Sequence, residues 1–230
     1  MTAFPFDAVL FDCDGVLVDS EPITARVLST MLGELGWPIT QDETLRVFVG
    51  KTVKDEAALI QSRTGFALTP EWLADFRARR NQALEQDLQA IAGAAQAVQA
   101  LHGTLAGRIA VGSGADVPKI ELQLRKVGVH EYFEGRIFSG QEQARNKPAP
   151  DVYLAAAHTL GVAPQRCAVI EDTVTGTAAG VAAGATVVGY SPGGPGHHGT
   201  AALLRAGAAQ VFHDMQALPA LLARAGAAAA

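Results

Sequence analysis

Two aspartates separated by one residue follow directly after a short apolar run near the start of the chain. The run is Ala8–Phe11, and Asp12, Cys13, Asp14 and Gly15 come next. A short apolar run that ends in turn residues is typical of a buried parallel strand, and ligands of such sheets bind where the strands end. Two carboxylates held together there are costly unless they share a cation or a proton. One aspartate would suffice to cap a helix, so the pair favours a metal-binding or catalytic site.

A second acidic pair follows another apolar run. Glu171 and Asp172 come directly after Cys167–Ile170. Hard oxygen ligands from two strand ends suit Mg²⁺, which binds few carboxylates and keeps water molecules that a phosphate can replace. The alternative, in which this pair only caps the next helix, stays open.

Two more segments carry candidate phosphate-binding groups. Ser113 and Gly114 end a third apolar run and offer a hydroxyl and exposed amides, which can form a cradle for an oxyanion or a phosphate. The alternative for Ser113 is a simple helix cap. Lys147 is followed closely by two prolines, which restrict the backbone around it. The alternative for Lys147 is a solvated surface lysine.

The elements that must position these groups alternate along most of the chain. The short β-rich runs are Ala8–Phe11, Arg108–Gly112, Arg136–Ser139, Cys167–Ile170, Thr186–Tyr190 and Gln210–Phe212. The helical stretches between and after them are Ala94–Leu101, Pro118–Val127, Pro150–Leu160, Thr175–Ala183, Ala201–Ala206 and Met215–Leu222. This alternation predicts an α/β fold with a doubly wound parallel sheet and right-handed crossovers.

One stretch interrupts the alternation. From Ser20 to about Gln89 the sequence carries only helix signals, among them a capping box that begins at Thr40 and an N-cap at Thr69 followed by Pro70. We expect an all-helical domain inserted directly after the first strand. The predicted boundaries are 1–15 and 90–230 for the sheet core and 16–89 for the insert.

Composition excludes several function classes. Of the 230 residues 49% are hydrophobic, and 18 basic against 23 acidic residues give a net charge of −5. Disorder is not expected, and a mildly acidic chain without a long basic run is a poor partner for nucleic acid. The chain has no run of about 18 apolar residues that could span a membrane, and Met1–Asp7 lacks the pattern of a secretory signal. Two cysteines cannot build a disulfide framework. We expect a cytoplasmic enzyme, with a monomer as the default.

Taken together, these motifs resemble those of the haloacid dehalogenase superfamily, in particular its phosphatase and β-phosphoglucomutase-like branch. In chain order they are Asp12–Asp19 (DCDGVLVD), Ser113, Lys147-Pro148 and Glu171-Asp172, and the match covers nearly the whole chain. The resemblance implies a Rossmann-like core with a helical cap inserted after the first strand. The family sheet order implies that both acidic pairs lie at one metal ion.

The resemblance also implies a Mg²⁺-dependent phosphatase that works through an aspartyl-phosphate. Asp12 would be the nucleophile, and Asp14 would act first as general acid and then as general base. Mg²⁺ would be held by the Asp12 carboxylate, the Asp14 backbone carbonyl and Asp172, with Glu171 as a ligand or a supporting contact. The roles of Asp12 and Asp14 need opposite starting protonation states, which a buried carboxyl pair near a metal can provide.

In the same resemblance, the phosphate oxygens would be held by Ser113, the Gly114 amide and Lys147. Substrate choice would depend on the cap. Lys51, in a loop beside a glycine, and Arg80 are the candidates to meet a polar or anionic substrate end, with solvated surface charges as the alternative. The segments 15–18 and 89–93 would be the hinges of the cap.

Two features separate the activities of the branch. Asp14 and Asp172 argue against a dehalogenase, because the dehalogenases of the superfamily lack the second aspartate of the first motif and the Mg²⁺ site. Thr24 lies where the β-phosphoglucomutases carry a histidine, which favours hydrolysis. We expect a small phosphorylated substrate such as a sugar phosphate. A β-phosphoglucomutase-like isomerase is the alternative, and a binding protein without activity is disfavoured because every motif residue is intact.

Overall fold

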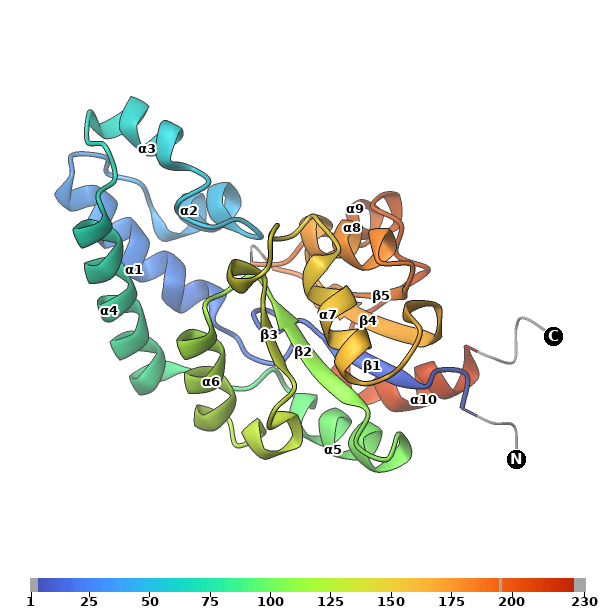
Figure 1. Ribbon diagram of the computed structural model, residues 1–230. Coiled ribbons are helices and arrows are strands. Elements are labelled where there is room, and N and C mark those ends of the chain that lie inside the picture. The colour runs from blue at the N-terminus through green and yellow to red at the C-terminus, as the bar shows by residue number, and fades with distance from the viewer. Residues whose placement is uncertain (1–3, 195, 226–230) are drawn as a thin grey trace.

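The computed structural model describes residues 4–194 and 196–225. Within these residues six strands form one parallel sheet in the order β3-β2-β1-β4-β5-β6 (Figure 1). The strands are β1 (Ala8–Phe11), β2 (Ile109–Ser113), β3 (Ile137–Ser139), β4 (Cys167–Glu171), β5 (Thr186–Tyr190) and β6 (Gln210–Phe212). From β1, strands β2 and β3 extend the sheet towards one edge, and β4, β5 and β6 extend it towards the other. The strand order therefore switches between β1 and β4, and ligands of doubly wound sheets bind at such a switch point. The predicted fold class is confirmed.

Helices cover both faces of the sheet. The α-helices of the core are α5 (Ala94–Thr104), α6 (Val117–Lys126), α7 (Asp151–Thr159), α8 (Val174–Ala182), α9 (Thr200–Arg205) and α10 (Leu218–Arg224). Short 3₁₀ helices are η1 (His130–Phe133), η2 (Gly140–Glu142), η3 (Pro164–Arg166) and η4 (Met215–Ala217). Among the helices of the described residues, none has the length and apolar character needed to cross a bilayer.

The side chains of β1 show why the strands are continuously apolar. Val9 and Phe11 pack in one buried cluster with residues of α5, α6 and α10. Ala8 and Leu10 point to the opposite face, where they pack with α7, α8 and α9. Because successive strand residues alternate between two covered faces, every position of the strand is buried and the polar residues begin where the strand ends.

The helical insert forms a lobe of its own beside the sheet (Figure 1). Its helices are α1 (Glu21–Glu34), α2 (Gln41–Phe48), α3 (Ala57–Thr64) and α4 (Pro70–Asp87). The capping box at Thr40 is present, and the Thr69 hydroxyl accepts a hydrogen bond from the Trp72 amide. The insert has a separate apolar core that includes Leu28, Ile60 and Phe76. A separate core supports the predicted division of the chain, whose boundaries remain a prediction.

The two connections between core and insert lie side by side. The Asp19 amide donates to the Gln89 carbonyl over 3.0 Å, and the Ile91 amide donates to the Leu17 carbonyl over the same distance. Leu17, Gln89 and Ile91 lie within the predicted hinges 15–18 and 89–93, and Asp19 lies one residue beyond the first. The hinge role of these segments remains a prediction.

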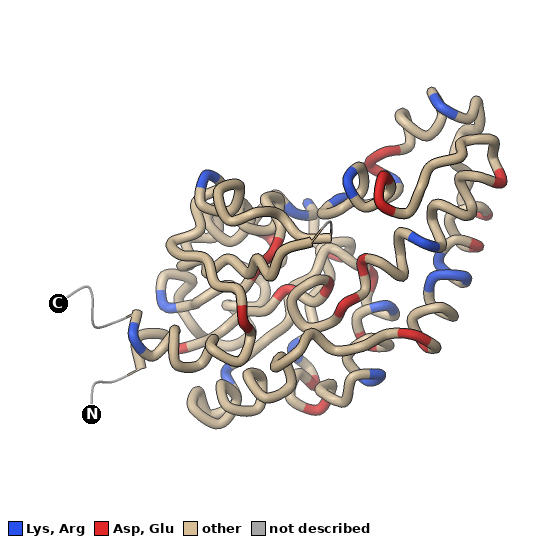
Figure 2. The backbone as a smooth tube through the Cα atoms, turned by 180° about the vertical axis from the view of Figure 1, so that it is seen from behind, with Lys and Arg blue, Asp and Glu red and all other residues tan. Residues whose placement is uncertain are grey.

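Charges are distributed over both lobes. Figure 2 shows Lys and Arg interspersed with Asp and Glu rather than collected in one stripe. With a net charge of −5, such a mixed distribution does not favour an extended contact with a nucleic acid backbone.

Candidate active site

The two acidic pairs meet because β1 and β4 are neighbours. Phe11 is in register with Ile170, and the Asp12 amide continues the ladder by donating to the Ile170 carbonyl over 3.0 Å. A carboxylate oxygen of Asp12, one of Glu171 and one of Asp172 all lie within 4.8 Å of one another. All three residues are buried. The sheet therefore builds the acidic cluster that the sequence motifs predict.

Gly15 makes the close approach of the first motif to Asp172 possible. Its φ is +76°, and a β-carbon at this position would overlap the Asp172 carboxylate. The chain turns sharply here, and the Gly15 amide donates to the Val18 carbonyl over 2.9 Å. Only glycine meets both the backbone and the steric requirement without strain.

Lys147 supplies the positive charge of the cluster. Its Nζ lies 2.9 Å from Asp12 Oδ1, 2.6 Å from Glu171 Oε1 and 2.9 Å from the Tyr153 hydroxyl. The side chain is only 8% exposed, so this ammonium is not the solvated surface charge that the alternative interpretation assumes. A buried lysine with two carboxylate partners compensates the charges that surround it.

Glu171 and Asp172 differ in their contacts although they are adjacent in sequence. Glu171 Oε1 accepts from Lys147 and Tyr153, and Oε2 accepts from Thr173 and the Asp172 amide. Both oxygens of Asp172 are buried and accept no hydrogen bond from any described residue, although His197 Nε2 lies 4.0 Å from Oδ2. This contrast favours Asp172 as a direct metal ligand and Glu171 as the supporting contact.

The acidic cluster fits a hard divalent cation. Burial raises the pKa of Asp172 well above its usual value, and the neighbouring carboxylates of Glu171 and Asp12 raise it further. An unpartnered, buried carboxylate beside a second carboxylate is the oxygen donor set that Mg²⁺ prefers. Asp12 and Asp172 are the residues that would hold the ion through their side chains, with the Asp14 carbonyl remaining a predicted ligand.

We expect the substitution Asp172→Asn to remove most of the stabilisation of the protein by Mg²⁺. In EDTA the variant should melt at a higher temperature than the wild type, because it removes a buried carboxylate without a partner. At a Mg²⁺ concentration of a hundred times Kd the wild type should gain about 2.7 kcal/mol, and the variant should lose most of that gain. Thermal melts with EDTA or Mg²⁺ measure both effects, with Asp42→Asn as an exposed control. Equal Mg²⁺ stabilisation of both variants would contradict the ligand role of Asp172.

Asp14 faces a different set of groups. Its Oδ1 accepts hydrogen bonds from the Ser20 hydroxyl, from Lys119 Nζ over 2.7 Å and from Gln123 Nε2 over 2.7 Å. Burial by itself raises the pKa of Asp14, but the Lys119 ammonium and the three hydrogen bonds outweigh this effect and lower the pKa to about 2.

Asp12 has the opposite shift. Burial raises its pKa to about 7 against the opposing charge of Lys147, and the carboxylates of Glu171 and Asp14 contribute to the rise. The two pKa values are separated, as expected, but in the reverse order to the one that the proposed roles need at the start of the reaction. The reason is that burial, together with the carboxylates of Glu171 and Asp14, outweighs the Lys147 ammonium at Asp12, whereas the Lys119 ammonium and three hydrogen bonds outweigh burial at Asp14. A cation bound by Asp12 and Asp172 would lower the pKa of Asp12.

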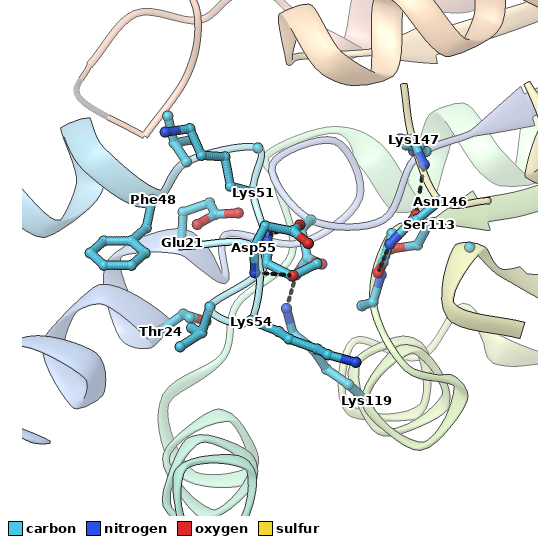
Figure 3. A pocket seen from close by; sticks show the side chains of 18 of the residues that line it. Glu21, Thr24, Phe48, Lys51, Lys54, Asp55, Ser113, Lys119, Asn146 and Lys147 are labelled. Carbon is cyan, nitrogen blue, oxygen red and sulfur yellow. Dashed lines mark hydrogen bonds and ion pairs between the residues drawn. The ribbon is translucent and has the colours of Figure 1, made fainter. Parts of the chain in front are cut away.

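The predicted phosphate cradle lies beside Lys147. Ser113 is 1% exposed, and its hydroxyl accepts from the Ala115 amide over 3.2 Å. Asn146 connects the two segments, because its Nδ2 donates to the Gly114 carbonyl over 3.1 Å while its Oδ1 accepts from the Lys147 amide over 2.8 Å. Figure 3 shows Ser113, Asn146 and Lys147 together on one side of the pocket.

Core and insert enclose a cavity of about 450 Å³. Asp12, Asp14, Ser113 and Lys147 line it from the core, and the predicted insert residues Lys51 and Arg80 also line it. In Figure 3, Lys51 and Phe48 of the insert lie across the pocket from Lys147.

The two insert residues have ionic partners of their own. Lys51 is exposed and pairs with Glu56 over 2.9 Å, whereas Arg80 is buried and pairs with Asp116 of the core over 3.1 Å. Arg80 therefore connects the insert to the core, and the substrate-binding role of Lys51 remains a prediction.

Sequence reasoning missed several polar residues of this site. Those lining the cavity or bonded to its carboxylates are Glu21, Lys119, Gln123, Asn146 and Tyr153. A signal existed for two of them: Lys119 and Gln123 directly precede Ile120 and Leu124, the buried apolar positions of α6. Polar residues beside the buried stripe of a helix indicate partners inside the molecule.

A family model described as haloacid dehalogenase-like hydrolase matches residues 6–184. The chain belongs to this family. The 6-phosphogluconate phosphatase of Escherichia coli (strain K12) is 31% identical over 182 residues, which are 79% of this chain and 80% of that protein. The phosphoglycolate phosphatase of Thiobacillus denitrificans (strain ATCC 25259 / T1) is 28% identical over 200 residues, 83% of this chain and 87% of that protein. A HAD family hydrolase from Deinococcus radiodurans R1, solved with bound phosphate and sodium, is 42% identical with a TM-score of 0.78, covering 97% of each chain.

Membership of the haloacid dehalogenase-like hydrolases confirms the resemblance seen in the sequence. Because the relatives are phosphatases, it also confirms the predicted enzyme class, a hydrolase of phosphoric monoesters. The roles of the individual site residues remain predictions, and the geometry above is the basis on which they are proposed.

Proposed function

We propose that the protein is a Mg²⁺-dependent phosphatase of small phosphorylated metabolites, such as sugar phosphates, that forms an aspartyl-phosphate on Asp12. One observation carries the proposal: the Asp12 carboxylate is hydrogen-bonded to Lys147 and lies beside Asp172, which accepts no hydrogen bond, at a cavity lined by both core and insert. A carboxylate so placed can approach a phosphoryl group whose charge is already compensated.

In the first step an Asp12 oxygen attacks phosphorus, and the bond between phosphorus and the alcohol oxygen breaks. Asp14 gives a proton to the departing alcohol, so that the alcohol leaves neutral; this step requires Asp14 to be protonated in the substrate complex, although its pKa is about 2 without substrate. Ser113, the Gly114 amide and Lys147 hold the remaining phosphate oxygens, where negative charge is concentrated during transfer.

In the second step water attacks the phosphorus of the aspartyl-phosphate. Asp14, now a carboxylate, accepts a proton from that water, the bond between phosphorus and the Asp12 oxygen breaks, and inorganic phosphate leaves. When bound, Mg²⁺ offsets the repulsion between the anionic nucleophile and the anionic phosphate. The residues that would hold it are Asp12, Asp14 through its carbonyl, and Asp172.

The substrate class follows from the relatives and the cavity. The similar proteins are named for 6-phosphogluconate and phosphoglycolate, which are small phosphomonoesters with a carboxylate at the far end. A cavity of about 450 Å³ with Lys51 on the insert side has room for a molecule of that size. We therefore propose a phosphorylated sugar or a related short-chain acid as the substrate.

The decisive experiment is a screen of phosphorylated metabolites for release of inorganic phosphate with Mg²⁺ or EDTA. We expect Mg²⁺-dependent release from p-nitrophenyl phosphate and from at least one sugar or short-chain phosphate, ranked by kcat/KM. The variant Lys51→Ala should lower kcat/KM for a preferred anionic substrate by about fivefold relative to the other substrates, because a surface-accessible charge contact is worth about 1 kcal/mol. Lys126→Ala, exposed on α6, is the matched control. An unchanged ranking would remove Lys51 as a specificity residue.

A β-phosphoglucomutase-like isomerase is the second candidate. Thr24 of α1 lines the cavity and occupies the position where the mutases carry a histidine, which is the observation against it. Conversion of β-glucose 1-phosphate without release of phosphate would favour the mutase over the phosphatase.

A further inference from the structure

Helix α6 presents a buried lysine to the site. This lysine does not belong to any of the recognised motifs. Lys119 is 6% exposed, and its Nζ lies 2.7 Å from Asp14 Oδ1. A lysine is rarely buried unless it is paired, because removal of an ammonium from water is costly. The carboxylate of Asp14 is the partner that compensates Lys119.

Gln123, one turn further along α6, bonds to the same oxygen. Its Nε2 lies 2.7 Å from Asp14 Oδ1, and its Oε1 accepts a hydrogen bond from the Cys13 thiol at 3.4 Å. Because an ionised carboxylate only accepts hydrogen bonds, the NH₂ end of the amide faces Asp14 and the oxygen faces the thiol. Residues four positions apart share one face of a helix, so α6 brings two donors to a single carboxylate oxygen.

Asp14 is thereby held through one oxygen. Oδ1 accepts from Ser20, Lys119 and Gln123, whereas Oδ2 accepts no hydrogen bond from the described residues. Asp14 itself lines the cavity. A carboxylate fixed at Oδ1 has only one oxygen left for a substrate, in a defined direction.

The end of α6 that carries Lys119 is itself anchored. Asp116 caps the helix by accepting from the Lys119 amide over 3.1 Å, and it pairs with Arg80 of the insert over 3.1 Å. In Figure 3 the Lys119 side chain extends from α6 into the centre of the pocket and ends in a dashed contact. The donor therefore has little freedom to leave Asp14.

We propose that Lys119 is a positioning residue for Asp14 in departure of the alcohol. It directs Oδ2 towards the bridging oxygen of the substrate, so that the proton carried by Oδ2 in the substrate complex moves to that oxygen. The bond between phosphorus and the bridging oxygen breaks in the same step, and Lys119 keeps all its protons. This inference rests on the proposed phosphatase function.

The test compares two leaving groups. p-Nitrophenolate is a stable anion and leaves without a proton, whereas an alkoxide needs one. The value of kcat/KM reports the steps up to departure of the alcohol. It is measured for p-nitrophenyl phosphate and for the alkyl phosphate that the wild type hydrolyses fastest, in Lys119→Met, Lys119→Arg and Gln123→Met. Lys126→Met, exposed on the same helix, is the control.

Lys119→Met should lower kcat/KM for the alkyl phosphate by about 100-fold, which lies within the contribution of a positioned general acid. For p-nitrophenyl phosphate the loss should be only a few-fold. Lys119→Arg keeps the charge with a different donor geometry and should show an intermediate, equally selective loss. Gln123→Met should also lower kcat/KM more for the alkyl phosphate than for p-nitrophenyl phosphate, but by a smaller factor.

Equal losses for both substrates would overturn the proposal, because they indicate a role in phosphate binding or in folding. The absence of any loss would overturn it as well. If Lys119→Met melts before it can be assayed, Lys119→Arg and Gln123→Met decide by the same ratio. Failure of the proposed function has a different signature: the wild type releases phosphate from neither substrate.

Discussion

Replacement of Asp12 by Asn is expected to reduce phosphatase activity by about 10⁵-fold or more, which is the scale of loss when a catalytic nucleophile is removed. The amide keeps the shape of the side chain but has no anionic oxygen to attack phosphorus. Because Asp12 lies within hydrogen-bond distance of Lys147, the substitution removes the nucleophile while leaving the neighbouring groups in place. Steady-state release of phosphate from p-nitrophenyl phosphate measures the effect.

A second measurement separates loss of chemistry from loss of folding. Acid quench of the wild type during turnover should trap a phosphoryl group on the peptide that contains Asp12, and the Asp12→Asn protein should carry none. Asp7→Asn, near the start of β1 in an exposed pair with Arg166, is the matched control and should keep its activity. Retention of phosphatase activity by Asp12→Asn with a folded far-ultraviolet spectrum would rule out Asp12 as the nucleophile.

The second large effect is expected from Lys147→Met. Removing the ammonium leaves the Asp12 and Glu171 carboxylates buried without their shared counter-ion. Loss of one partner from a buried ionic contact costs about 3–5 kcal/mol in the free energy of unfolding. Activity should also fall, by about 10²–10³-fold, because a donor to the transferring phosphoryl group is lost. Urea titration and kcat/KM measure the two losses.

A double variant tests the physical origin of that destabilisation. In Lys147→Met/Glu171→Gln the second substitution removes one of the stranded charges, so stability should recover in part while activity stays low. Mg²⁺ should also recover part of the stability of Lys147→Met, since a cation bound by Asp12 and Asp172 compensates Asp12, one of the two stranded carboxylates. Arg145→Met, exposed two residues before Lys147, is the control. If neither charge removal nor Mg²⁺ restores stability, the loss comes from packing and not from electrostatics.

Local sequence signals were sufficient for the elements of the fold. Strands covered by helices on both faces are continuously apolar, so all six runs could be identified without knowing their neighbours. The capping signals at Thr40 and Thr69 lie within a few residues of their partners, and such local contacts form in the same way in many folds. The first motif and its resemblance supplied the family, which the family model then confirmed.

The partners of the site residues were not encoded locally. Asp14 and Lys119 are 105 positions apart, and Asp12 and Lys147 are 135 positions apart. Which charges meet depends on how α6 and the Lys147 segment pack against the ends of β1 and β4. The spacing of hydrophobic residues shows which face of a helix is buried, but it does not identify the group opposite that face.

What the sequence determined by itself was therefore the set of elements, the motif residues and the chemistry of which those residue types are capable. The tertiary structure decided which carboxylate is left without a partner, Asp172 rather than Glu171, and in which direction the pKa values of Asp12 and Asp14 move. The physical reason is that hydrogen-bond occupancy and burial are through-space properties. They arise only once distant segments are packed into one cavity.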